Sequence, residues 1–504
     1  MALGGSNAGR ALPLVCAALS RSLSRSVVGG AHSDILVLVE PDESTPLNVA
    51  GARKVILFGA LPAAFRRAFE ARPAAAAIGD WSAAPPASQN HPSESPARIV
   101  YSDRAIALGG RSWQRALRRY DFADEWNTLG FGTITADQSH WSLCPPLQIE
   151  QGELARLELS GKMVASYAGL LDSPGQSILW FNRAVGVIDS FEWRLVENFL
   201  SAHRAEELPV VPVLSEIPDG HDAAVTMRLD CDEDIESARP LWLAYRERGV
   251  PMSLAIHTKL LGAGAAPLID DVRASGGAIL SHSSTHAPWW GGSYDAARRE
   301  AADSARALQA ATAHRPRHAV SPFHQTADFA ASALADEGYD GCIGGNVRAD
   351  PEFVAARGGV FASTPGDFVV HTQQCMLHGD CLSRGDDPIA PFRQAFDLAY
   401  DSASLFGYLD HPFSARYQYG WADESTRIAA HLALIDHIAH RARRPLFLNE
   451  DTALDLLSRK ARIAVTRTAT GFAVALPPAG DNAPRLVAEF RGQRIVLHDG
   501  IQLS

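Results

Sequence analysis

The segment Leu280-Ser281-His282-Ser283-Ser284-Thr285-His286 carries two histidines four residues apart. Side chains at this spacing lie on one side of a helical turn, so both imidazoles can face one metal ion. The segment follows an apolar run at residues 276–279, which we interpret as a buried strand. Taken alone, such a pair is more often an ordinary surface or core feature, so a metal site requires a further ligand.

An acidic pair lies about fifty residues earlier. The apolar run 223–229 leads directly into Asp230-Cys231-Asp232. At a strand end, residues 230 and 232 point to the same side and residue 231 points away. Both carboxylates can therefore reach the region of the histidines, and we interpret Cys231 as a small packed residue. The two segments together predict a metal site with a spare base.

The order and spacing of these motifs resemble the polysaccharide deacetylase family, which is carbohydrate esterase family four and contains the NodB homology domain. Residues 282–286 fit the family's His-Ser/Thr-x-x-His motif position by position. Asp230-x-Asp232 is similar to a variant of its acidic motif. The resemblance implies that Asp230 is the catalytic base. It also implies that Asp232, His282 and His286 hold a divalent metal, which we expect to be Zn²⁺.

Two later motifs of the family are recognisable only in part. Leu409-Asp410-His411-Pro412 resembles the late Leu-x-His motif, which implies that His411 is the general acid; a structural strand-end histidine is the alternative. Residues 321–323, Ser-Pro-Phe, occupy the place of an Arg-x-Pro-aromatic motif. Its base-orienting arginine is not recognisable, because Arg315 and Arg317 lie too early. This departure suggests a divergent subfamily with a different substrate.

Four residues are expected to bind the substrate. Pro322 and Phe323 belong to the partial motif just described. Trp289 follows the histidine pair and could stack on a sugar ring, with core packing as the alternative. His378 lies in the polar segment 373–380, which is either part of the substrate pocket or a solvated loop.

Strands and helices alternate after residue 208, a boundary marked by a Pro-rich segment. Helical patterns occupy residues 235–248, 267–275, 294–313, 327–337, 387–402, 425–441 and 451–462, with short apolar runs between them. This alternation predicts a parallel sheet, and its length suits a distorted (β/α) barrel over residues 208–462 with its chemistry at the carboxyl ends of the strands. His431, His437 and His440 are expected on a helix surface.

Three further regions surround the predicted barrel. Residues 34–207 predict a small open α/β domain, flavodoxin-like or amidotransferase-like, with no nucleophile elbow or phosphate loop and hence no catalytic role. Residues 463–504 predict a short antiparallel β module that packs on the barrel. Residues 1–33 are interpreted as a disordered or start-site extension. Their weak likeness to a signal peptide makes export the alternative to a cytoplasmic location.

Composition excludes several classes of partner. The 504-residue chain has a net charge of −11, which argues against nucleic acid or an anionic membrane as the main partner. No apolar run is long enough for a membrane span. The six cysteines show no paired framework, which favours reduced thiols. The oligomeric state is not indicated.

Together these observations predict metal-dependent removal of an acetyl or formyl group from an amino sugar. The expected partner is an N-acylated amino sugar in a glycan or a surface-polysaccharide precursor. Two alternatives remain: a carbohydrate-binding or assembly protein whose site has decayed, and a hydrolase of a non-sugar amide on the same fold.

Overall fold

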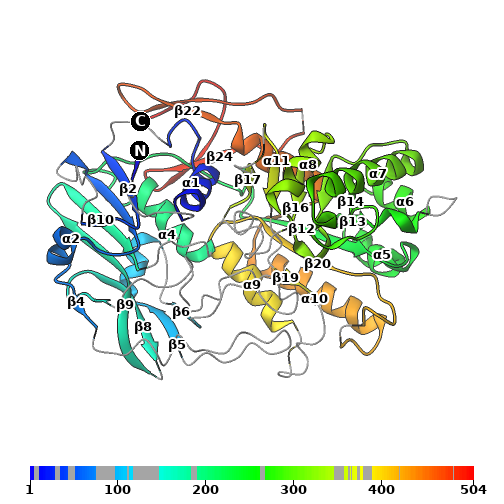
Figure 1. Ribbon diagram of the computed structural model, residues 1–504, viewed down its shortest axis with the longest axis horizontal. Helices are drawn as coiled ribbons and strands as arrows, with labels where there is room; N and C mark the ends of the chain where they lie inside the picture. Colours follow the sequence, from blue (N-terminus) through cyan, green and yellow to red (C-terminus); the bar gives the residue numbers. More distant parts are fainter. Residues whose placement is uncertain are drawn as a thin grey trace.

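The structure is a computed structural model (Figure 1). It describes residues 1–4, 11–28, 34–43, 51–74, 97–109, 113–116, 147–159, 161–182, 190–261, 267–344, 357–360, 364, 366–371, 375–377, 387, 389–418, 420–480 and 482–504. Two large sheets lie side by side, an amino-terminal one at the left of Figure 1 and a helix-covered one at the right, with the carboxyl-terminal strands above them.

Strand β12 (Ala223–Cys231) lies within the second large sheet, and all nine of its residues are buried. Its odd-numbered residues pack in one apolar cluster with the helices that cover the sheet. Its even-numbered residues, which include Arg228 and Asp230, face the opposite side. Burial on both faces is typical of a parallel strand and explains the continuous apolar run in the sequence.

The neighbours of β12 are mostly parallel to it. In spatial order the sheet runs β17 (Gly359–Val360), β18 (Val369–His371), β16 (Gly341–Ile343), β15 (His318–Val320), β14 (Ile279–Ser281), β13 (Ser253–Ile256), β12, β20 (Phe406–Asp410) and β19 (Cys375–Met376), while β21 (Pro445–Leu448) pairs with the start of β12. Only β17 is antiparallel to its neighbour. Within the described residues no hydrogen-bonded pairing joins the two end strands, β17 and β19, so these strands form an open sheet. The pairing that would close the predicted barrel is therefore not observed in this part of the chain.

Each of the seven predicted helices is present and differs from its expected bounds by no more than about one turn. They are α5 (Arg239–Glu247), α6 (Pro267–Ala274), α7 (Tyr294–Thr312), α8 (Asp328–Asp336), α9 (Ala390–Asp401), α10 (Glu424–Arg441) and α11 (Glu450–Ala461). The alternation of strands and helices read from the sequence is therefore confirmed in the described part of the chain. No helix in that part has the length and apolar character that a membrane span requires.

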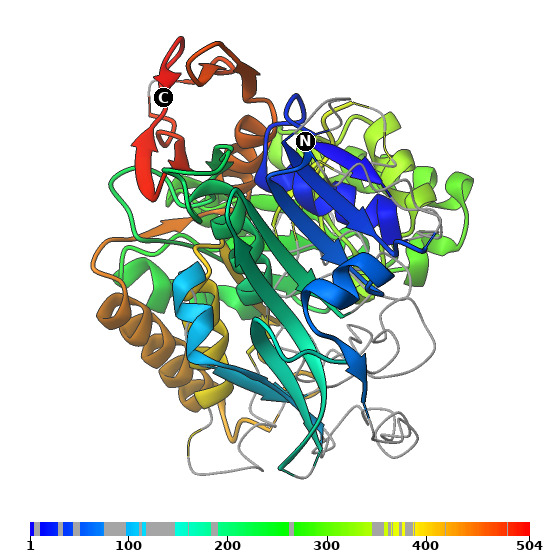
Figure 2. The same cartoon turned by 90° about the vertical axis from the view of Figure 1, so that its left-hand side faces the viewer.

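The amino-terminal sheet is half parallel and half antiparallel (Figure 2). Its order is β1 (Ala2–Gly4), β2 (Ile35–Val39), β3 (Lys54–Phe58), β10 (Gln176–Phe181), β9 (Lys162–Ser173), β8 (Glu153–Leu159), β5 (Ala97–Tyr101) and β6 (Trp113–Ala116). Strands β1 to β3 and β10 are parallel and the others antiparallel. The sheet is thus more antiparallel than the predicted flavodoxin-like or amidotransferase-like domain, because the two-residue turn between β9 and β10, with Gly175 at φ 75°, forces a hairpin.

Helices cover both faces of this sheet. α1 (Ala11–Ser22) and α4 (Ser190–Ser201) share one apolar cluster with one face, and α2 (Ala63–Ala68) packs on the other. A disordered extension over residues 1–33 is therefore wrong for the parts that are described: β1 pairs with β2, and Val15 and Leu19 of α1 are buried. Within the apolar stretch that weakly resembles a signal peptide, Val15, Ala17, Ala18 and Leu19 are buried.

The carboxyl-terminal strands divide between two small sheets. One contains β22 (Ala464–Arg467), β23 (Phe472–Ala475) and β26 (Gln502–Leu503); the other joins β24 (Val487–Phe490) and β25 (Gln493–Val496) to β11 (Val213–Leu214). These strands share an apolar core with the amino-terminal sheet, α11 and the strands of the second sheet. The predicted antiparallel pairing is confirmed, but the strands pack on the amino-terminal part as well as on the predicted barrel.

A cluster of buried charges joins the same regions. Arg357 binds Glu197 of α4, with 2.7 Å between Nη2 and Oε2, and also donates to the Ser402 carbonyl. Lys460 of α11 lies 3.1 Å from Glu216. Because a buried charge without a partner is costly, this cluster holds the amino-terminal part, α11 and the second sheet in one arrangement.

We predict that Arg357→Met lowers the free energy of unfolding by about 3–5 kcal/mol, because Glu197 would remain buried without its main counter-ion. Denaturant unfolding followed by circular dichroism measures the loss. Arg298→Met is the matched control, because Arg298 is 49% exposed and its pair with Glu337 should contribute little. Equal, small effects of the two substitutions would contradict a stabilising role for the buried cluster.

Candidate metal centre and active site

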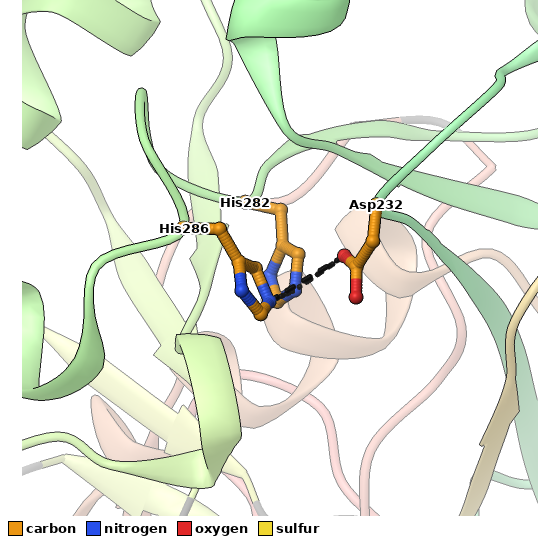
Figure 3. A group of neighbouring side chains, drawn as sticks. All are labelled: Asp232, His282 and His286. Carbon is orange, nitrogen blue, oxygen red and sulfur yellow. Dashed lines mark hydrogen bonds and ion pairs between the residues drawn. The ribbon is translucent and has the colours of Figure 1, made fainter. Parts of the chain in front are cut away.

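Asp232, His282 and His286 meet at the carboxyl ends of β12 and β14 (Figure 3). Oδ1 of Asp232 lies 3.4 Å from Nε2 of both histidines, and the two Nε2 atoms lie 3.1 Å apart. The three side chains lie on the wall of a cavity of about 470 Å³. Cys231 points away into the core, as the strand alternation predicts.

These three residues suit a divalent ion. Oδ1 of Asp232 is buried and accepts no hydrogen bond from the described residues. The two imidazole Nε2 atoms lie 3.1 Å from each other, with the carboxylate oxygen beside them. A cation would accept the unshared electron pairs of these three atoms. A tetrahedral Zn²⁺ with bonds of about 2.0–2.2 Å keeps its ligands about 3.3–3.5 Å apart, close to the separations observed here.

The histidines converge through a loop and not through the helical turn assumed from their spacing. Ser283 and His286 have positive φ values of 63° and 53°. The hydroxyl of Ser283 accepts the His286 N–H at 2.9 Å, and the carboxylate of Glu300 accepts the N–H groups of Ser284 and Thr285. These side-chain hydrogen bonds fix a tight loop that folds His286 back over His282.

A hydrogen bond to the backbone sets the tautomer of His282. Nδ1 lies 3.0 Å from the carbonyl oxygen of Val320, which can only accept, so Nδ1 carries a proton and Nε2 faces Asp232. This arrangement is usual for histidines that bind metals. Burial alone would lower the pKa of His282, but the nearby carboxylates of Asp230 and Asp232 outweigh it and raise this pKa.

The other two candidate ligands have depressed pKa values. Burial and the neighbouring charge of His282 lower the pKa of His286 to about 4, so His286 is neutral and able to bind a metal at neutral pH. Burial works against ionisation of Asp232, yet its approach to His282 and the nearby histidines lowers its pKa well below the usual range. The set therefore offers one carboxylate and two imidazoles.

Asp230 is oriented by an arginine that the sequence analysis did not find. Nε of Arg228 lies 2.6 Å from Oδ1 of Asp230, and Nη2 lies 3.1 Å from Oδ2, so the pair is bidentate. Burial would raise the pKa of Asp230, but the charge of Arg228 overcomes it and holds this pKa at about 2. Arg317 instead binds Asp340 and Asp455, beyond the amino-terminal end of β15.

The position of Arg228 explains why it was missed. It precedes Asp230 by two residues on β12, so both side chains lie on the same face of the strand. The resemblance directed attention to the segment after β15, where Ser321 stands. The alternation of the strand was the available signal, because a buried arginine on the same face as a buried aspartate is expected to pair with it.

His411 follows β20 and reaches the cavity, with Nε2 3.5 Å from Oδ2 of Asp232. Behind it, Asp410 accepts the His411 N–H at 2.7 Å, and Arg427 donates to the His411 carbonyl. His431 lies 2.9 Å from Asp410 and is fully buried, so its predicted surface position is wrong. His431 lies on the buried face of α10, four residues after the buried Arg427. This helical spacing could have predicted that the two side chains share the buried face.

The predicted substrate-binding residues have different positions. Phe323 lines the cavity, is 36% exposed, and its ring centroid lies 4.6 Å from that of His286. Trp289 is 40% exposed but does not line the cavity, while its neighbour Trp290 is buried. Pro322 is buried. His378 lies outside the described residues.

The loops of this wall carry unusual backbone conformations. Six of the twelve described non-glycine residues with positive φ lie here: Ser283, His286, Trp289, Trp290, Phe323 and His324. Such conformations concentrate at functional sites, where the surroundings hold them in place. The loop after β15, which carries Phe323, also brings His324 to the cavity. The sequence analysis did not single out His324.

The cavity is lined only by residues between Asp230 and Gly420 in the described part of the chain. The acidic, histidine, Ser-Pro-Phe and late histidine segments therefore meet in one place. Solved structures described as polysaccharide deacetylases are among those that match this chain. Solved structures described as family 4 carbohydrate esterases are also among its matches.

Three solved structures illustrate these similarities. The carbohydrate deacetylase Agd3 is 10% identical, with a TM-score of 0.40, over 100% of this chain and 99% of its own. The chitin deacetylase of the fungal pathogen Colletotrichum lindemuthianum is 14% identical, with a TM-score of 0.31, over 46% and 87%. An allantoinase is 13% identical, with a TM-score of 0.38, over 48% and 92%. No protein-family model and no curated protein matches the sequence.

We predict that Arg228→Met makes the difference in stability between the metal-free wild type and the variant depend on pH between pH 4 and 8. In the wild type the depressed pKa of Asp230, about 2, gives stability that is fully present above pH 4 and is lost only as pH falls through that value. Without Arg228, burial raises this pKa, so the variant loses stability as pH rises, by about 3–5 kcal/mol near neutrality. Denaturant unfolding in the presence of a chelator at several pH values measures the gap, which is the difference in free energy of unfolding between the wild type and the variant.

Arg317→Met is the control, since it removes an arginine whose aspartate partners are exposed. Its gap to the wild type should be small and constant over the same range. If the gap for Arg228→Met is also constant, the ionisation of Asp230 does not depend on Arg228.

Proposed function

We propose that the protein is a metal-dependent amide hydrolase that removes an acetyl group, or a formyl group, from an amino sugar in a glycan or a surface-polysaccharide precursor. One observation carries the proposal: Asp232, His282 and His286 converge in a cavity that also holds Asp230 and His411. This is the set of groups that hydrolysis of an unreactive amide requires. The preferred ion is Zn²⁺, for which one carboxylate and two imidazoles are suitable ligands.

Asp230 is the proton acceptor in this proposal. Bound at Asp232, His282 and His286, a divalent ion would make water more acidic and polarise a carbonyl oxygen. Asp230 is held ionised by Arg228, so it can accept the proton of the attacking water at neutral pH. The bidentate contact with Arg228 also prevents the carboxylate from turning away from the cavity.

His411 is the proton donor. An amine is a very poor leaving group unless its nitrogen is protonated as the carbon–nitrogen bond breaks. The His411 ring lies on the Asp232 side of the cavity, and its backbone is held by Asp410 and Arg427. A rigid imidazole in this position can deliver a proton to the departing nitrogen while Asp230 serves the water.

The cavity and its rim support a sugar as the substrate. A volume of about 470 Å³ is typical of small-molecule sites. Phe323 lines the cavity with a partly exposed ring that can cover the apolar face of a sugar. Trp289 lies outside the lining, and its exposed ring is proposed to contact a more distant part of a longer glycan. The paired buried charges and the complete ligand set favour an active site over a decayed one. Residues before 208 are proposed to have no reacting group.

The test of this proposal is release of acetate or formate from a panel of N-acylated amino sugars, their oligomers and their nucleotide or lipid conjugates. We expect release from at least one sugar, its loss with a chelator, and its return with Zn²⁺. Small linear amides are the comparison substrates. Hydrolysis of linear amides alone would contradict the sugar assignment, and release that survives complete metal removal would contradict the metal.

His411→Ala should separate the acid from the rest of the site. We expect amide turnover to fall by about 10²–10⁴-fold at unchanged metal content, because the amine loses its proton donor. An activated ester needs no such donor and should lose much less. Equal losses on the amide and the ester would identify His411 as a structural residue.

A further inference from the structure

The two carboxylate oxygens of Asp232 have different surroundings. Oδ1 faces the histidines, 3.4 Å from Nε2 of His282 and of His286. Oδ2 accepts a hydrogen bond of 2.8 Å from the hydroxyl of Tyr417 and lies 3.5 Å from Nε2 of His411. One oxygen is thus available to a cation, and the other is engaged on the far side.

The phenol of Tyr417 is held firmly in this position. The side chain is buried, and its ring stacks on His411 with 4.4 Å between centroids and 12° between planes. Its backbone N–H donates to the hydroxyl of Ser414, which in turn donates to Glu233 at 2.7 Å. Because Glu233 is the residue after Asp232, the loop that carries Tyr417 is anchored to the strand end that carries the carboxylate.

The number of oxygens that a carboxylate offers affects which ion it binds. Zn²⁺ sites are almost always four-coordinate when structural, and catalytic ones keep three protein ligands and an open position. Ions that prefer carboxylate and water oxygens, such as Mn²⁺, take six ligands in an octahedral arrangement. A carboxylate that can supply a second oxygen therefore favours the ion with more ligand positions.

We infer that Tyr417 is a positioning residue that makes Asp232 a one-oxygen ligand and thereby biases the site toward Zn²⁺ over Mn²⁺. The inference rests on the proposed function, since it takes Asp232, His282 and His286 as the metal ligands. Outer hydrogen bonds of this kind commonly change metal affinity by about 10–100-fold.

The test is Tyr417→Phe, which keeps the ring and its stacking on His411 but removes the hydroxyl. Oδ2 of Asp232 then loses its hydrogen bond to Tyr417 and can turn toward the ion. We expect the affinity of the purified full-length protein for Zn²⁺ to fall about 10–100-fold, and that for Mn²⁺ to fall less or to rise. The Zn²⁺/Mn²⁺ affinity ratio should drop at least about tenfold. Competition with a chromophoric chelator measures the Zn²⁺ affinity, and paramagnetic resonance of free Mn²⁺ measures the Mn²⁺ affinity.

Tyr294→Phe is the matched control, because it also removes a tyrosine hydroxyl bound to a carboxylate, Asp336, on the surface. It should leave both affinities unchanged. An unchanged ratio in Tyr417→Phe, whether the two affinities fall equally or stay the same, would overturn the inference while the proposed function stands. A wild-type protein that binds neither ion would overturn both.

Discussion

Arg228 and Asp230 form an ion pair on a strand that is buried along its whole length. Two charges are stable there only because each neutralises the other through two hydrogen bonds. The pair keeps a carboxylate ionised in the wall of the cavity, where an isolated one would become protonated. A second buried set, Asp410 with Arg427 and His431, lies on and behind the adjacent strand β20, beneath His411. Both neutralised clusters thus lie next to the candidate site, one beside Asp230 and one beneath His411.

The parallel sheet determines which residues can meet in that space. The carboxyl ends of β12, β14, β15 and β20 lie at one edge, so residues 230–232, 282–286, 321–324 and 411 converge although about 180 positions separate the first from the last. The amino-terminal sheet, α11 and the carboxyl-terminal strands share an apolar core with this sheet. In the described part of the chain they contribute no residue to the cavity, so scaffold and site are separate.

Much of this arrangement follows from local sequence patterns. The alternation of apolar runs with amphipathic segments was sufficient to predict the helices and the parallel strands after residue 208, because each pattern depends on neighbours a few positions apart. The resemblance to the family motifs also brought Asp230, Asp232, His282, His286 and His411 forward as one set. Their placement together agrees with that set, while their chemical roles remain proposals.

Features that depend on tertiary contacts were not predictable in the same way. Tyr417 lies in a loop with no periodic pattern, and this loop is anchored by a hydrogen bond between Ser414 and Glu233 while the phenol binds Asp232. Local sequence patterns did indicate Arg228 and His431: the first shares a strand face with Asp230, and the second lies four residues after Arg427 on a helix. The sequence analysis followed the family motifs and did not use these patterns. The described residues before 34 show a different limit, because the packing of a short apolar stretch depends on distant neighbours that its own sequence does not indicate.

The most direct test of the metal assignment is anomalous diffraction from crystals grown with Zn²⁺, measured on both sides of the zinc absorption edge. One strong peak should lie about 2.0–2.2 Å from Oδ1 of Asp232 and from Nε2 of His282 and His286. Oδ2 should keep its hydrogen bond to Tyr417. A peak bound by other side chains, or no zinc peak in the cavity at full metal loading in solution, would contradict the assignment.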